Sequence, residues 1–106
     1  MAGPEILFEV RTPLGFLVRV SRARWELITT VKHPVMAGRE SSVKTTLESP
    51  DEVRQSRIDP DVLLFYKAEA VRRWVCAVTQ QADADALLVT AYPTDAIKEG
   101  VRIWPK

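Results

Sequence analysis

The side chains best suited to acid–base and phosphate chemistry are His33 and Arg57. The chain contains a single histidine, and histidine is the residue whose charge changes near neutral pH, so His33 suits a general acid or base. Arg57 follows Ser56 in a polar stretch, and an arginine side chain can donate two parallel hydrogen bonds to a phosphate. Both residues also have structural explanations. His33 precedes Pro34 at a predicted helix end, where a cation interacts favourably with the helix dipole, and Arg57 suits an exposed surface.

Four other candidate side chains lie at the ends of predicted strands. Tyr66 and Lys67 close an apolar run that begins at Val62, and an amphipathic strand end would explain both residues equally well. Tyr92 and Thr94 follow a second apolar run. The hydroxyl of Thr94 is either a ligand for substrate or the N-cap of a short helix.

The composition argues against several common kinds of functional site. His33 and Cys76 are the only histidine and cysteine and lie far apart in the sequence, so we expect no metal or cofactor site and no internal disulfide. The four glycines are scattered and form no phosphate-binding loop. The net charge is +1, which by itself gives no argument for nucleic-acid binding. Arginines are nevertheless clustered, as at Arg72 and Arg73, so a local positive surface remains compatible with the sequence.

The length of 106 residues predicts one domain, residues 1–106, and 46% hydrophobic residues are enough for a core. No apolar run approaches the roughly 18 residues that span a bilayer, so we expect no membrane partner. The first five residues lack the charged-then-apolar pattern of a secretion signal. Together with the single cysteine, this predicts a cytoplasmic protein.

Periodicity and turn residues divide the chain into short elements. Alternating apolar residues predict a β-hairpin over 6–20, and helical spacing predicts two helices, over 21–32 and 39–48. Ser49, Pro50 and Glu52 have the spacing of a capping box, which predicts a further helical turn over 49–55. Strands are expected over 62–67, 71–79 and 86–91, a small helix over 95–99, and a short strand or docked tail over 101–104.

This order predicts an α+β domain. We expect the N-terminal hairpin and the helices to pack on an antiparallel sheet of about four strands, with a short C-terminal helix.

An ordered set of motifs resembles one known family. The set comprises Trp25-Glu26-Leu27-Ile28, His33-Pro34, Thr46–Val53, Ser56-Arg57, Val62–Lys67 and Val89–Thr94. It is similar to phage and bacterial toxin-type members of the barnase–EndoU–colicin E5/D–RelE-like nuclease superfamily. The resemblance spans roughly residues 16 to 104 and implies a metal-independent endoribonuclease, with RNA as substrate and an antitoxin or immunity-type protein as a partner.

The resemblance also implies roles for the candidate residues in one cleft. His33 is then the acid or base, and Arg57 and Lys67 stabilise the phosphate charge. Thr94 joins His33 and Arg57 as a catalytic residue, and with Tyr92 it holds the substrate or its phosphate, with Ser56 nearby. Trp25 or Tyr66 stacks on a base, although Trp25 is equally explained as a core residue.

One position departs from the family pattern. Leu27 stands where relatives often have a second histidine before the isoleucine of the Trp-x-x-Ile segment. If that histidine is needed, the chain is a catalytically inactive relative that binds RNA or another protein. A non-enzymatic interaction domain, in which the candidate residues are caps and turn residues, is the alternative from outside this family.

Overall fold

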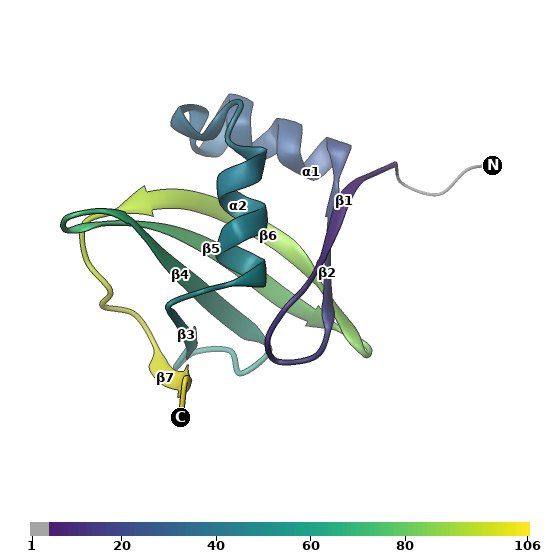
Figure 1. Ribbon diagram of the computed structural model, residues 1–106. Helices are drawn as coiled ribbons and strands as arrows, with labels where there is room; N and C mark the ends of the chain where they lie inside the picture. Colours follow the sequence, from purple (N-terminus) through teal and green to yellow (C-terminus); the bar gives the residue numbers. More distant parts are fainter. Residues whose placement is uncertain (1–4) are drawn as a thin grey trace.

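A computed structural model describes residues 5–106. The absence of a secretion signal was predicted partly from residues 1–4, which lie outside the described part. Seven strands form one sheet in the order β1-β2-β6-β5-β4-β3-β7 (Figure 1). The strands are β1 (Ile6–Arg11), β2 (Leu17–Ser21), β3 (Glu52–Gln55), β4 (Val62–Ala70), β5 (Arg73–Ala82), β6 (Asp85–Thr94) and β7 (Val101–Trp104).

The prediction of an antiparallel sheet of about four strands is wrong, because the sheet is larger and mixed. The strands β3, β4, β5 and β6 pair consecutively and antiparallel. The N-terminal hairpin β1–β2 extends this sheet through a parallel pairing of β2 with β6, and β7 pairs with β3 at the other edge. A parallel contact between distant segments leaves no local sequence signal, which is why the pattern did not reveal it.

The predicted helical turn over 49–55 is also wrong. Helix α2 (Glu40–Glu48) ends with the Ser49 N–H donating to the carbonyl of Thr45, and the following residues form β3. Glu52 lies opposite Tyr66 in the β3–β4 ladder. The capping-box spacing is a local preference, and pairing with a buried strand outweighs it.

The predicted C-terminal helix over 95–99 is absent, since residues 95–100 connect β6 to β7 without a helix. The Thr94 hydroxyl accepts a hydrogen bond from the Ala96 N–H and donates one to the Ala96 carbonyl. Ile97 packs against the sheet. A helix of one turn gains few hydrogen bonds for its nucleation cost, so sheet packing determines this segment instead.

The first predicted helix is present but changes its winding. Helix α1 (Arg22–Leu27) begins with Ser21, whose hydroxyl accepts from the Arg24 N–H, and continues as the π-helical turn η1 (Ile28–Lys32). The hydroxyls of Thr29 and Thr30 donate to carbonyls one turn earlier, a contact that loosens helical winding. The helix ends before His33, as predicted, and the 3-10 turn η2 (Pro34–Met36) follows.

The helices pack on one face of the sheet, which we call the inner face. Helix α2 contacts β4 and β5 (Figure 1). Buried residues from the helices and from alternate strand positions form one core. They include Trp25, Ile28, Met36, Val43 and Leu47 from the helices, and Val18, Val20, Val53, Phe65, Val75, Ala77, Leu88 and Ala91 from the sheet.

Candidate functional site

The opposite face of the central strands, which we call the outer face, has a different composition. Its residues alternate with those of the inner core, because successive side chains of a strand point to opposite faces. Leu64, Tyr66 and Cys76 are buried there, and half-buried side chains pack around them. The half-buried residues are Trp74, Val78, Tyr92 and Ile97.

Three polar groups form a row across the outer face. Tyr66, Cys76 and Tyr92 are register partners on β4, β5 and β6, so both tyrosines neighbour the Cys76 thiol. Burial raises the pKa of Cys76 to about 11, although polar interaction with the two tyrosine hydroxyls opposes this shift. Burial also raises the pKa of Tyr66 and Tyr92, and the neighbouring thiol adds to the effect. At neutral pH the row is therefore uncharged.

His33 lies at one end of this row. The centroid of its ring is 5.3 Å from that of Tyr92, with the two planes tilted by 38°. The π-helical turn η1 and the 3-10 turn η2 both contact β6, so they carry the half-exposed imidazole to the strand. The sequence predicted both residues as site residues, and the structure brings them into contact.

Thr94 lies near this end of the sheet, two residues beyond Tyr92. It lines a hollow of about 310 Å³ together with Arg73, Pro93 and Asp95. The arginine is exposed and places a cation beside Thr94. The Thr94 hydroxyl is also held by its local turn, so part of its role is structural.

Ser56 and Arg57 lie at the other end of the strands. The Ser56 N–H donates to the carbonyl of Val62, near the start of β4. Thr94 is the register partner of Trp74, and Trp74 is the register partner of Ala68, near the far end of β4. The strand from Val62 to Ala68 is roughly 20 Å long at ~3.3 Å per residue. Arg57 therefore does not share one phosphate with His33 and Thr94, contrary to the single cleft that the family resemblance implied.

The Arg57 end has its own hollow and its own local bonding. Arg57 lines a hollow of about 400 Å³ with Ser56, Ile58, Lys98, Glu99 and Gly100. The Ser56 hydroxyl accepts from the N–H groups of Ile58 and Asp59, which is the turn role that the sequence left open.

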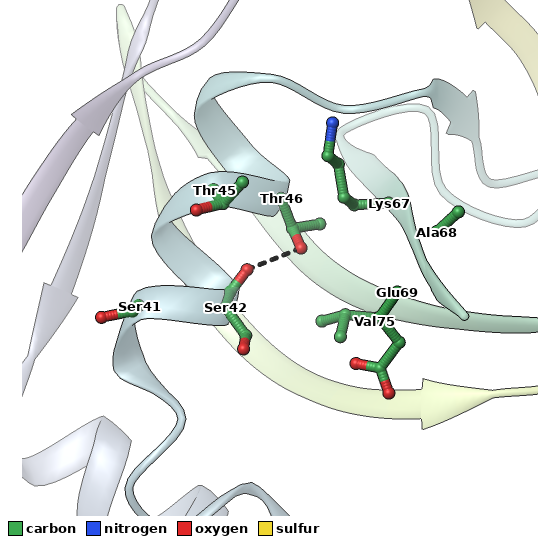
Figure 2. A pocket seen from close by; sticks show the side chains of 8 residues that line it. All are labelled: Ser41, Ser42, Thr45, Thr46, Lys67, Ala68, Glu69 and Val75. Carbon is green, nitrogen blue, oxygen red and sulfur yellow. Dashed lines mark hydrogen bonds between the residues drawn. The ribbon is translucent and has the colours of Figure 1, made fainter.

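Lys67 lies on the inner side of the sheet. It lines a hollow of about 260 Å³ between α2 and β4, opposite the hydroxyl-bearing residues Ser42, Thr45 and Thr46 (Figure 2). Its Nζ is 3.7 Å from Asp51 Oδ1. Lys67 is thus separated by the sheet from the His33–Tyr92 pair.

Tyr66 is 2% exposed, so its ring is not offered to a base in this conformation. The half-buried Trp74, whose register partner is Thr94, is better placed for stacking. Sequence reasoning assigned no site role to Trp74 or Arg73. The clustered Arg72-Arg73 was a signal for the cation, but its position beside Thr94 was not readable from the sequence.

Within residues 5–106, no group of three or more His, Cys, Asp or Glu side chains is arranged to hold a metal ion. None of the helices in this range is long and apolar enough to cross a membrane. Comparison of the chain with protein-family models, curated proteins and solved structures found no match.

Proposed function

We propose that the protein is a metal-independent endoribonuclease that binds single-stranded RNA on the outer face of its sheet. The observation that carries this proposal is the position of the histidine. His33 lies against Tyr92, at the end of the sheet where Thr94 and Arg73 line a hollow. Aromatic side chains beside cations are the usual composition of surfaces that bind single-stranded nucleic acid.

The chemistry requires one proton acceptor and one cation near the scissile phosphate. His33 takes the proton of the ribose 2′-hydroxyl, and the 2′-oxygen forms a bond to phosphorus while the bond to the 5′-oxygen breaks. The leaving oxygen takes a proton from water, and the product is a 2′,3′-cyclic phosphate. Arg73 replaces Arg57 in this proposal as the cation that stabilises the developing charge.

RNA binding without cleavage is the second candidate function. Leu27, at the position where the nuclease resemblance suggests a second histidine, is 39% exposed and supplies no proton. The outer face would still bind RNA in that case, because stacking and cationic contacts do not depend on an acid–base pair. A protein partner of the antitoxin or immunity type stays a prediction of the resemblance.

The test is incubation of the purified protein with total RNA in EDTA, next to His33→Ala and Arg57→Gln. We expect the wild type to produce discrete fragments, His33→Ala to produce none, and Arg57→Gln to cleave nearly as well as the wild type. Circular dichroism verifies that all three proteins are folded.

Equal cleavage by the wild type and His33→Ala would contradict the assignment of His33. Gel-shift binding of RNA by all three proteins without cleavage would favour the second candidate function. Neither cleavage nor binding would overturn both candidates.

A further inference from the structure

The sheet forks where β2 leaves β6. The two strands pair through Val18–Ala86 and Arg19–Leu87, after which β2 ends at Ser21 and β6 continues to Thr94. A hollow of about 320 Å³ lies in this fork. We refer to it as the fork hollow.

The walls of the fork hollow are mainly apolar. They include Ile6, which is 43% exposed, and Leu87, which is 50% exposed, together with Leu88 and Val89 of β6. Exposed aliphatic side chains that converge on one concave site, rather than being scattered singly, are typical of a ligand pocket.

Two arginines supply the charge of the fork hollow. Arg19 is already matched by Glu9, at 2.7 Å, and by Asp85, at 3.2 Å. Arg24 also lines the hollow and has no ion-pair partner among residues 5–106. No Asp or Glu of the described chain is among the residues that line the hollow. A ligand here therefore meets apolar walls and one uncommitted cation.

We propose that the fork hollow binds a small carboxylate with an apolar body. The carboxylate accepts hydrogen bonds from the Arg24 guanidinium, whose planar fork matches the two carboxylate oxygens. The apolar body packs between Ile6 and Leu87 and covers surface that both side chains now expose to water. This binding site lies apart from the His33–Tyr92 pair and does not depend on the proposed reaction with RNA.

The experiment is a titration of the ¹⁵N-labelled full chain with hexanoate, followed by amide chemical shifts, with hexanamide as the neutral ligand of the same shape. We expect hexanoate to change the amide chemical shifts of Arg24, Leu88 and Val89. The dissociation constant should be about 1 mM, because a ligand of so few atoms gains little binding free energy. Hexanamide should bind at least about tenfold more weakly, because it cannot form the ion pair.

Arg24→Gln removes the cation and should weaken hexanoate binding by about tenfold. Arg22→Gln is the matched control, since Arg22 is on the same helix but pairs with Glu5 and does not line the hollow. Leu87→Asp is a second variant at an exposed position, and its carboxylate should abolish binding by repelling the ligand.

Equal binding of hexanoate and hexanamide, unchanged affinity in Arg24→Gln, or shifts confined to other parts of the sheet would each overturn the proposal. Absence of binding to the folded wild type at about ten times the expected dissociation constant, roughly 10 mM, would overturn it as well.

Discussion

The two faces of the central sheet use the same strands for different purposes. On the inner face, aliphatic and aromatic side chains from the helices and sheet form one continuous buried core. On the outer face, the buried cluster is small and includes two polar side chains, those of Tyr66 and Cys76, and the half-buried Tyr92 packs against it. Adjacent residues belong to opposite faces, as do Phe65 and Tyr66 on β4.

This difference separates stability from chemistry. Apolar area removed from water supplies most of the stabilisation of a fold, and that area is concentrated on the inner face. Half-buried aromatic rings on the outer face, with His33 against Tyr92 and the exposed Arg73 at the same end of the sheet, remain available to a ligand. Substitutions on the two faces should therefore have distinct effects.

The largest expected effect is on stability and uses a matched pair on β5. Val75 is 2% exposed on the inner face, whereas Val78 is half-buried on the outer face. Val75→Ala should lower the free energy of unfolding by about 2 kcal/mol, the cost of two lost methyl groups and a residual cavity. Val78→Ala should cost less than about 1 kcal/mol, since water already reaches the side chain. Urea unfolding measures both values, and equal losses would show that the faces contribute alike.

The next effect concerns pH and the polar row of the outer face. The folded-state pKa of Cys76 is raised to about 11 from an ordinary value of 9.0. Between these values the unfolded chain loses the thiol proton and the folded chain keeps it. The contribution of the buried thiol to the free energy of unfolding should therefore be fully present below about pH 9. Above that pH the free energy of unfolding should fall by up to ~1.4 kcal/mol per pH unit.

Cys76→Ser keeps a hydrogen-bonding group and removes the titration at this pH. Urea midpoints measured from pH 8 to pH 10 should fall more steeply for the wild type than for Cys76→Ser. Tyr66 and Tyr92, whose pKa values are also raised, contribute in both proteins above about pH 10. Identical pH dependence of the two proteins would mean that the thiol is not protected by burial.

The smallest expected effect compares two cations at different places on the sheet, Arg73 in the hollow with Thr94 and Lys67 in the hollow beneath α2. Arg73→Gln, next to Thr94, should weaken binding of a labelled single-stranded RNA by about threefold to tenfold. It should also reduce the slope of log affinity against log salt by about 0.7 for one lost phosphate contact. Lys67→Gln, on the inner side of the sheet, should change neither quantity. Fluorescence anisotropy at several salt concentrations measures both, and an equal loss in Lys67→Gln would place RNA elsewhere.

Elements with a complete local pattern were predictable. The hairpin β1–β2, helix α2 and strands β4, β5 and β6 follow from apolar periodicity and from turn residues such as Pro13 and Gly15. Gly15 has a φ of 94°, a backbone conformation that glycine adopts without strain. The errors lie at Ser49–Gln55 and Asp95–Glu99, where local capping signals competed with pairing and packing on the sheet.

The candidate site was predictable in its residue types and not in its grouping. His33, Tyr92 and Thr94 were singled out from the sequence, and the structure places them at one end of β6. Arg57 and Lys67 were singled out by the same reasoning and lie at the opposite end of the strands and on the inner side. Strand direction and side-chain alternation decide such grouping, and both depend on register.

The sequence by itself determined where most strands and helices form, because hydrophobic periodicity and turn residues act over a few neighbouring positions. The tertiary structure alone decided that β2 pairs in parallel with β6, that the fork hollow lies between them, and that residues 52–55 form a strand. These features depend on contacts between segments far apart in the chain. A strand's partner sets its register and hence which side chains share a face, and no local pattern encodes that choice.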